Sequence, residues 1–348
     1  MGHERAARGA ELSAHEVLVT GGGGFLGGAI VDLLLQRGYG VRSVSRGCYP
    51  ELEARGVRCF QADLTDAAAM AEAARGCDTV FHVAARAGIW GDPKLFFDVN
   101  DAGTQVVIDA CRQAGVARLI FTSSPSVVQT DGDCEGGDES LPYPAQHRTA
   151  YQASKAAAER AVLAANGDGL ATVSLRPRLI WGPGDPHLVP RLVARARAGR
   201  LRLVGAGDNL VDMTFVTDAA QAHLDAFDRL VEGEGRGETA ACAGRAYFIS
   251  GGAPRPFRET VNDLMRASGA PEVERSVPPW LAFVAGGCCE LLWRVLPLPG
   301  EPPMTRFLAR QLATANWYDL SAARRDLGYE PAVTWRQGLS LLAERPPD

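Results

Sequence analysis

The sequence predicts an α/β protein in which a doubly wound parallel sheet is followed by a second, smaller and mostly helical domain. Two observations predict this fold. Over the first half of the chain, short runs rich in Val, Ile and Phe alternate with helix-length segments, which is typical of a parallel sheet covered on both faces. Beyond Gly184 the strict alternation ends, so a smaller lobe is expected there.

The composition is that of a globular chain and makes nucleic-acid binding unexpected. The 348 residues are 46% hydrophobic and 22% charged, which is ordinary for soluble proteins. Their number is large for one domain, so one large unit and one smaller unit are expected. The net charge of -5 lacks the basic excess that binds nucleic acid.

The first predicted strand, at residues 17–20, and the first predicted helix, at 25–36, enclose a Gly-x-x-Gly-x-x-Gly turn. Such a turn leaves backbone N–H groups uncovered beside the positive end of a helix, where a dinucleotide pyrophosphate binds. A merely flexible loop is the alternative, since the chain has 39 glycines, but the flanking strand and helix favour a Rossmann nucleotide site. The predicted cofactor contacts here are Gly21, Gly24, Phe25, Leu26 and Gly27.

The end of the second predicted strand, at residues 41–45, bears on the choice of cofactor. Where an NAD-binding fold places Asp or Glu against the ribose 2′-hydroxyl, this chain has Ser45 and Arg46. A carboxylate would repel a 2′-phosphate, whereas Arg46 can pair with it. The sequence therefore favours NADP(H) over NAD(H). The alternative is a solvated arginine in an arginine-rich chain.

Five further strands complete the predicted sheet. They are expected at residues 56–61, 78–85, 117–122, 171–177 and 246–250, with helices at 65–75, 99–114 and from 149 between them. Ligands bind such sheets at the carboxyl ends of the strands. The residues expected there beside the adenine and ribose are Asp63, Leu64, Ala84 and Ala85.

The predicted domain boundaries follow the end of the strand–helix alternation. The dinucleotide-binding domain comprises residues 15–182 and 205–251, and the substrate-binding domain residues 183–204 and 252–348, after a flexible tail at 1–14. Helices are expected at 187–197, 218–230, 257–267 and 279–295, an extended stretch at 202–204 and a short strand at 212–216. Residues 131–140 and 232–243 are expected to be polar loops, and the chain beyond 295 to consist of proline-punctuated loops.

The segment at residues 279–295 is the most apolar of the chain. Glu290, Arg294 and a pair of glycines make it a poor transmembrane candidate. We interpret it as a lid over a hydrophobic substrate, with Trp280 as a candidate substrate contact. Interfacial membrane contact and plain core packing are the alternatives.

Tyr151 and Lys155 are four residues apart on a predicted helix, so their side chains share one face. A free tyrosine has a pKa near 10, but an adjacent ammonium and an oxidised nicotinamide ring favour the phenolate. Tyr151 can then exchange a proton with a substrate oxygen. Ser124, which follows the strand at 117–122, faces the same crevice and can hold a carbonyl oxygen against Tyr151. A polar strand end is the structural alternative for Ser124.

The eight cysteines are scattered, without the spacing of a zinc site or a disulfide framework. A reduced, cytoplasmic protein without a metal is therefore expected. The N-terminal residues are charged and lack the apolar core of a signal peptide. Because residues 279–295 are apolar, two further partners remain alternatives: a membrane surface and another enzyme of the same pathway.

The chain resembles the extended short-chain dehydrogenase/reductases, in their 3β-hydroxysteroid dehydrogenase-like branch, from about residue 17 to residue 331. The resemblance rests on Thr20-Gly-x-x-Gly-Phe-Leu-Gly27, Asp63-Leu64, His82-Val-Ala-Ala85, Asn100-x-x-Gly-Thr104, Thr122-Ser-Ser124, Tyr151-x-x-x-Lys155, Arg176-Pro177, Gly182-Pro-Gly184 and Leu327-Gly-Tyr-Glu-Pro331. It implies a catalytic set of Ser124, Tyr151 and Lys155. It also implies cofactor contacts from Asn100, Tyr151, Lys155 and Pro177, and a homodimer through the helices at 100–114 and 151–165.

Within this branch, several stretches are similar to bacterial reductases of long-chain olefin biosynthesis. They are Ser45-Arg-Gly-Cys-Tyr-Pro-Glu-Leu52, Ala87-Gly-Ile-Trp-Gly91, Ser123-Ser-Pro-Ser-Val127, Leu175-Arg-Pro-Arg-Leu-Ile-Trp-Gly-Pro-Gly-Asp185 and Pro299-Gly-Glu-Pro-Pro-Met-Thr-Arg306. This similarity implies NADPH-dependent reduction of the 3-keto group of long-chain 2-alkyl-3-oxoalkanoic acids to the 3-hydroxy acids. Arg178 or Arg191 is a candidate partner for the substrate carboxylate, and either can instead be a surface charge.

Two other functions remain open. The first is NAD(P)-dependent oxidation of a 3β-hydroxysteroid or of a sterol 4-carboxylate, which uses the same catalytic set and the same lid. The second is a non-catalytic dinucleotide-binding scaffold, which would be expected to lack Ser124, Tyr151 or Lys155. The chain departs from the family pattern at one place: many extended members carry Tyr-Gly after the serine strand, whereas this chain has Val127-Val-Gln129. The resemblance therefore does not predict the substrate-side wall of the site.

Overall fold

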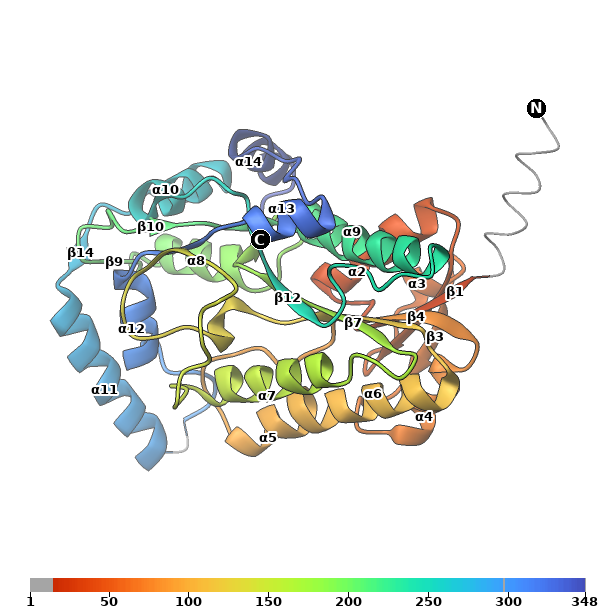
Figure 1. The fold of residues 1–348 in the computed structure, drawn as a ribbon. Helices are drawn as coiled ribbons and strands as arrows, with labels where there is room; N and C mark the ends of the chain where they lie inside the picture. Colours follow the sequence, from red (N-terminus) through yellow and green to blue (C-terminus); the bar gives the residue numbers. More distant parts are fainter. Residues whose placement is uncertain (1–14, 297, 348) are drawn as a thin grey trace.

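A seven-stranded parallel sheet runs through the larger lobe of the computed structural model, which describes residues 15–296 and 298–347 (Figure 1). Its order is β12-β7-β5-β4-β1-β2-β3. The strands are β1 (Glu16–Thr20), β2 (Gly40–Ser45), β3 (Arg58–Gln61), β4 (Cys77–His82), β5 (Arg118–Thr122), β7 (Ala171–Pro177) and β12 (Arg245–Ile249). Each predicted strand of the sheet is present, and the predicted doubly wound α/β fold is confirmed.

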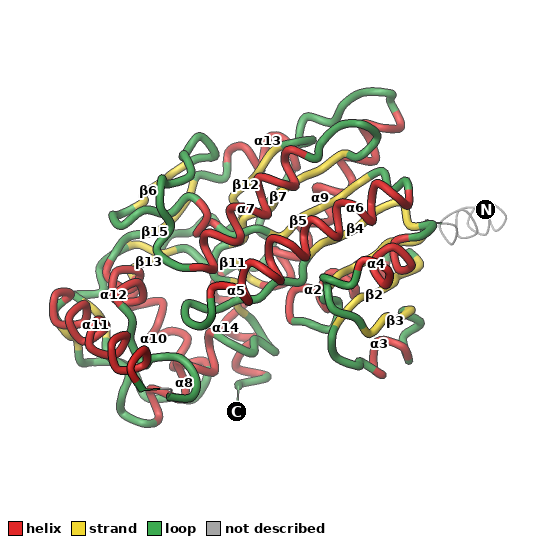
Figure 2. The backbone as a smooth tube through the Cα atoms, turned by 90° about the horizontal axis from the view of Figure 1, so that it is seen from below, coloured by secondary structure: helices red, strands yellow, loops and turns green. Residues whose placement is uncertain are grey.

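Helices cover both faces of this sheet (Figures 1 and 2). One face carries α2 (Phe25–Gln36), α9 (Val216–Gly235) and α13 (Ser321–Leu327); the other carries α4 (Ala67–Ala74), α6 (Gly103–Ala114) and α7 (Ala150–Ala164). The short helices α3 (Pro50–Glu53) and α5 (Pro93–Phe97) lie in the connections. Strand order changes direction between β1 and β4, so the two connections diverge there and leave a crevice at the carboxyl ends of the strands.

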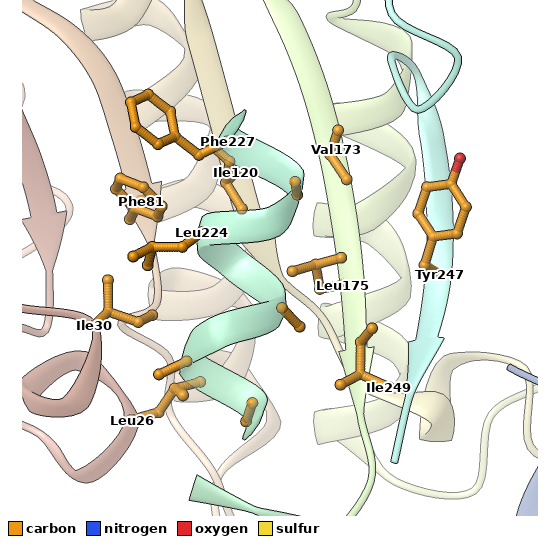
Figure 3. Packing of buried hydrophobic residues seen from close by; sticks show 14 of the residues in the cluster. Leu26, Ile30, Phe81, Ile120, Val173, Leu175, Leu224, Phe227, Tyr247 and Ile249 are labelled. Atoms are coloured by element: carbon orange, nitrogen blue, oxygen red, sulfur yellow. The ribbon is translucent and has the colours of Figure 1, made fainter. Parts of the chain in front are cut away.

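The core on the α2/α9 face is shown in Figure 3. Leu26 and Ile30 of α2 meet Leu224 and Phe227 of α9, and Phe81 of β4 packs edge-on against Phe227 at a centroid distance of 5.7 Å. Burial of each such side chain contributes about 1.5–3 kcal/mol. The packing fixes α2, and with it the glycine turn at its start.

The smaller lobe is built from helices and short strands beyond the large sheet (Figure 2). Its helices are α8 (Leu188–Arg197), α10 (Phe257–Ala267), α11 (Pro279–Val295), α12 (Arg306–Ala313) and α14 (Trp335–Glu344). A four-stranded sheet has the order β13 (Arg255–Pro256), β10 (Leu210–Val211), β15 (Asn316–Tyr318) and β6 (Cys134–Gly137). Two further pairs join β8 (Ile180–Trp181) to β11 (Thr214–Phe215), and β9 (Leu203–Val204) to β14 (Ser276–Val277).

Three segments differ from their predicted structure. The expected loop at 131–140 contains β6, because its backbone pairs with β15, which lies far along the chain. The expected loops beyond 295 contain α12, β15, α13 and α14; a capping box of Thr334 with Gln337 starts α14, a signal that the prolines of this region obscured. Helix α9 continues to Gly235, into the loop predicted at 232–243.

The predicted tail at 1–14 lies outside the described residues, and the division into two domains stays a prediction. Leu320, Ala323, Leu327 and Tyr329 pack into the α2/α9 core, so this late part of the chain rests on the large sheet. Within residues 15–296 and 298–347, no helix combines the length and the hydropathy that a membrane span requires.

Candidate active site

The glycine turn between β1 and α2 has the geometry that a pyrophosphate requires. Gly21 has a φ of +74°, which is unfavourable for other residues. A Cβ on Gly27 would overlap the carbonyl of Gly21, so the helix can approach the turn only with glycine there. Gly24 is the N-cap of α2, so no side chain covers the start of the helix, and the first turn of α2 holds no acidic residue. The N-terminal amides of α2, which begins with Phe25 and Leu26, are therefore open to an anion.

The segment after β2 lies against this turn. The ring of Tyr49 occupies the space that a Cβ on Gly23 would need, a contact that the glycine pattern alone could not reveal. Ser45 ends β2 and its hydroxyl is buried without a partner. Arg46 is exposed, and its carbonyl accepts a hydrogen bond of 3.1 Å from Gln61. Ser45 and Arg46 thus follow one another at the carboxyl end of β2, where the 2′-position of the cofactor is predicted to lie.

Asp63, Leu64, Ala84 and Ala85 follow β3 and β4. The carboxylate of Asp63 accepts hydrogen bonds from the N–H and hydroxyl of Thr65, which lower its pKa, and Arg46 lowers it further. Leu64 packs on Gly103 of α6, and Ala84 packs on Gly21. The positive charge of Arg46 stabilises the carboxylate of Asp63, and β2 pairs with β3. The ends of these two strands therefore lie side by side.

Asn100 lies in a π-helical turn, Asp98–Ala102, inserted between α5 and α6. Its buried amide accepts from the N–H of Arg86 at 2.7 Å and donates to the carbonyl of Arg86 and the hydroxyl of Ser154, both at 3.0 Å. These three bonds join the segment after β4 to helix α7. Asn100 therefore positions the helix that carries Tyr151.

Ser124, Tyr151 and Lys155 come together at the end of β5. A capping box of Thr149 with Gln152 starts α7 just before Tyr151. The ammonium of Lys155 donates to the carbonyl of Thr122 at 2.6 Å and lies 4.1 Å from the ring centre of Phe121. The Ser124 hydroxyl hydrogen-bonds to the hydroxyl of Ser126 at 2.9 Å, a neighbour that sequence reasoning did not single out.

Burial controls the protonation of these groups. Desolvation lowers the pKa of Lys155 to about 7, although Glu159 opposes the shift. Desolvation raises the pKa of Tyr151, and a hydrogen bond with Ser124 lowers it in part. In the protein without a cofactor, the ammonium of Lys155 is directed to the carbonyl of Thr122, and Ser124 is the group that lowers the pKa of Tyr151. Tyr151 is a neutral phenol at neutral pH.

Two buried arginines flank Pro177 at the end of β7. The guanidinium of Arg176 makes three hydrogen bonds with the Glu159 carboxylate, the shortest 2.7 Å. Arg178 is only 8% exposed, yet no carboxylate of the described residues forms an ion pair with it, and its Nε has no partner. Leu179, the next residue, has a φ of +40°, a conformation that costs about 1–2 kcal/mol for residues other than glycine.

Two other residues proposed from the sequence as substrate contacts lie at the surface. Arg191 of α8 is exposed and pairs with Glu301 at 3.0 Å. Trp280 of α11 is 67% exposed. Helix α11 packs on α12 through its few buried residues, and its outer face exposes Trp280, Leu281, Val284, Leu291, Leu292 and Val295. This exposure contradicts the plain-core alternative for the segment.

A cavity of about 620 Å³ lies between α11, α12, the start of α7 and residues 89–96. Its wall is mixed: Ile89, Trp90, Phe96, Phe283 and Phe307 are apolar, whereas most of the other lining residues are polar or charged, among them Asp131, Glu290, Arg148, Arg294, Arg306 and Arg310. Ala150 and Gln152, which flank Tyr151 in the sequence, also line it. Helix α11 thus contributes Phe283 rather than Trp280 to the cavity wall, and it covers one side of the cavity as the predicted lid would.

Comparison with known proteins agrees with this geometry. Residues 18–278 match the model of the 3-beta hydroxysteroid dehydrogenase/isomerase family. A 2-alkyl-3-oxoalkanoate reductase of Stenotrophomonas maltophilia is 51% identical over 94% of this chain and 98% of its own length. One from Shewanella oneidensis is 43% identical over 93% of this chain and 84% of its own. A decarboxylating sterol-4-alpha-carboxylate 3-dehydrogenase of Mus musculus is 35% identical over 95% of this chain and 91% of its own.

Solved structures share the fold. MoeE5 in complex with UDP-glucose and NAD superposes with a TM-score of 0.71 at 25% identity, covering 94% of this chain and 97% of that one. DesIV, a dTDP-glucose 4,6-dehydratase of Streptomyces venezuelae with NAD bound, gives a TM-score of 0.71 at 25% identity, covering 94% and 95%. These similarities support a nicotinamide dinucleotide as cofactor.

Proposed function

Because the chain belongs to the 3-beta hydroxysteroid dehydrogenase/isomerase family and is an NAD(P)-dependent oxidoreductase, we propose that it reduces the 3-keto group of long-chain 2-alkyl-3-oxoalkanoic acids to 2-alkyl-3-hydroxyalkanoic acids in olefin biosynthesis. The observation that carries the proposal is the meeting of Ser124, Tyr151 and Lys155 at the end of β5 in a chain 51% identical to a reductase of that name. The five large apolar side chains in the cavity wall can contact the hydrocarbon chains of such a substrate.

The protonation states suit the direction of reduction. A ketone that accepts hydride develops negative charge on its oxygen, and NADPH supplies that hydride when bound. Tyr151, whose pKa burial raises, holds its proton at neutral pH and donates it to this oxygen. The Ser124 hydroxyl donates a hydrogen bond to the same oxygen and holds it against the phenol. Lys155 would hold a ribose hydroxyl of the bound cofactor, and its charge would stabilise the phenolate that remains.

NADP(H) is the proposed cofactor in preference to NAD(H). The end of β2 carries Ser45 and Arg46 and no carboxylate, so a 2′-phosphate meets a cation instead of an anion. Arg46 forms no ion pair within the described residues, and its guanidinium is exposed at the crevice. It can therefore pair with a phosphate without first breaking an internal salt bridge.

A dehydrogenase acting on a 3β-hydroxysteroid or a sterol 4-carboxylate is the second candidate. The relative of Mus musculus carries that name at 35% identity, and the aromatic side chains of the cavity wall can contact a sterol as well as an alkyl chain. Ser124, Tyr151 and Lys155 serve a reduction and an oxidation alike, so the choice of cofactor is what separates the two candidates.

The test follows the absorbance of NADPH with the purified chain and a long-chain 2-alkyl-3-oxoalkanoic acid. We expect Tyr151→Phe to lower kcat about 10²- to 10⁴-fold, the usual effect of losing a general acid. Tyr247→Phe is the matched control, because its phenol bonds to Asp326 outside the site. In the same assay with the keto acid, we expect NADPH to be oxidised faster than NADH. Reduction of NAD with a 3β-hydroxysteroid, while NADPH and the keto acid stay unchanged, would instead establish the second candidate.

A further inference from the structure

Arg178 is a buried cation without a counter-ion. Its side chain is 8% exposed, its Nε lies buried without a hydrogen-bond partner, and none of the described carboxylates pairs with it. The nearby carboxylate of Asp212 is already used by the N–H groups of Met213 and Gly252 and by the hydroxyl of Ser250. A buried guanidinium in this state retains its full capacity to bind an anion.

The backbone of Arg178 is held firmly. Its N–H donates to the carbonyl of Ile249 at 2.9 Å, and its carbonyl accepts from the hydroxyl of Thr214 at 2.6 Å. Leu179 beside it keeps a left-handed conformation although it is not glycine. Strain of this kind persists where the surrounding structure fixes the chain, and it is frequent at ligand-binding sites.

The register of the sheet places Arg178 near the reacting groups. Thr122 of β5 lies opposite Leu175 of β7, so Ser124 is level with Pro177, one residue before Arg178. Neighbouring strands are about 4.8 Å apart. Arg178 is therefore anchored at the same end of the same pair of strands as Ser124, within the reach of an arginine side chain.

A second buried polar side chain without a partner among the described residues lies on β15. Asn316 of β15 is 1% exposed, and neither its Oδ1 nor its Nδ2 has a partner among the described residues. Arg178 interacts electrostatically with Cys134, Asp212 and Tyr318. The backbone links Asn316 to each of these three residues. Cys134 lies opposite Asn316 in the pairing of β6 with β15, the N–H of Asp212 donates to the carbonyl of Asn316, and Tyr318 is two residues farther along β15.

We propose that Arg178, together with Asn316, forms a carboxylate-binding subsite for the substrate. This inference rests on the proposed function, since a 3-oxo acid carries its carboxyl carbon two bonds from the ketone carbon. The cation that binds the carboxylate must then be anchored close to Ser124 and Tyr151. Arg178 meets this condition, whereas Arg191 lies on the surface and is already paired with Glu301.

The test compares two substrates that differ only in the carboxylate: the 2-alkyl-3-oxoalkanoic acid and the ketone that forms from it by loss of CO₂. We expect Arg178→Met to lower kcat/KM for the acid about 10- to 100-fold, the range for a hydrogen bond to a charged group, and to leave the ketone within about twofold. Arg178→Lys should retain part of the preference, and Arg191→Met should retain all of it. Equal losses on acid and ketone would overturn the subsite.

A binding measurement separates failure of the subsite from failure of the proposed function. We expect palmitic acid to raise the thermal midpoint of the wild-type chain more than 1-hexadecanol does, and this difference to disappear in Arg178→Met. Asn316→Asp should also abolish it, because its carboxylate repels that of the ligand. If the keto acid is not reduced but the difference in thermal midpoint between the two ligands depends on Arg178, the proposed function is wrong and the subsite stands. If the keto acid is reduced and the difference survives in Arg178→Met, the subsite is wrong and the function stands.

Discussion

Arg176 and Arg178 lie two residues apart and share burial but not partners. The guanidinium of Arg176 meets Glu159, which also receives hydrogen bonds from Tyr143 and Ser174. Among the described residues no carboxylate lies within ion-pair distance of Arg178, although Asp212 acts on its pKa from farther away. A buried charge with a carboxylate partner belongs to the fold, even though the Nη1 of Arg176 has no hydrogen-bond partner, whereas a charge without a carboxylate lowers stability and indicates a ligand.

Lys155 is intermediate between these two arginines. Its ammonium has the carbonyl of Thr122 and the ring of Phe121 as neighbours, but no carboxylate within ion-pair distance. The three cations thus form a series from a charged partner, through a dipolar partner, to none. We therefore expect the free-energy cost of burying the charge to increase from Arg176 through Lys155 to Arg178, and each comparison can be tested.

The largest effect is expected from Arg176→Met. This substitution leaves the carboxylate of Glu159 buried without its cation, which typically costs about 3–5 kcal/mol. Urea denaturation followed by circular dichroism measures the free energy of unfolding. The double variant Arg176→Met with Glu159→Leu is the control, because it removes both charges and should recover most of the loss. If Arg176→Met were as stable as the wild type, the ion pair of Arg176 with Glu159 would not stabilise the fold, and the contrast with Arg178 would be wrong.

The next effect is a pH dependence that belongs to Lys155. Its pKa is about 7 in the folded protein against an ordinary 10.5, so between these values the unfolded chain binds more protons. The free energy of unfolding should therefore rise with pH over this window, by up to about 1.4 kcal/mol per pH unit. Urea titrations of the wild type and of Lys155→Met, subtracted pH by pH, isolate this slope. A flat difference would mean that Lys155 keeps its usual pKa.

The smallest effect, and the one that separates the two arginines most sharply, is expected from Arg178→Met. Because no partner is lost and an unpaired charge is removed, the free energy of unfolding should stay unchanged or rise by about 1 kcal/mol. The same urea titration measures it, with Arg176→Met as the matched substitution. A loss near that of Arg176→Met would show that Arg178 has a structural partner after all.

The sequence predicted the sheet because its signals are local. Strand composition, helix length and the glycine turn at residues 21–27 each depend on neighbouring residues, and so does the spacing of Tyr151 and Lys155. The pairing of β6 with β15 was not predicted because it joins residues about 180 positions apart; the Asp133 carboxylate, for example, accepts from the N–H of Ala315 across 182 positions.

The choice between Arg178 and Arg191 was open in the sequence for the same reason. Whether an arginine is free depends on which carboxylate lies beside it in space, and Arg191 finds Glu301 across 110 positions. Burial of Arg178 depends likewise on the strand β15 and on β6. The exposure of Trp280 could not be read from the apolar character of residues 279–295, because composition alone does not say which face of a helix is covered.

The π turn at Asp98–Ala102 places Asn100 between Arg86 and Ser154 within a helical run that continues from Pro93 to Ala114. A π turn holds one residue more than an α turn. A gene can therefore lose one codon here and still encode an uninterrupted helix. Removal of the extra residue would leave α5 and α6 in register, but loss of Asn100 would take away the amide that joins α7 to the segment after β4. The residue that interrupts the regular helix is thus the one that holds two parts of the site together.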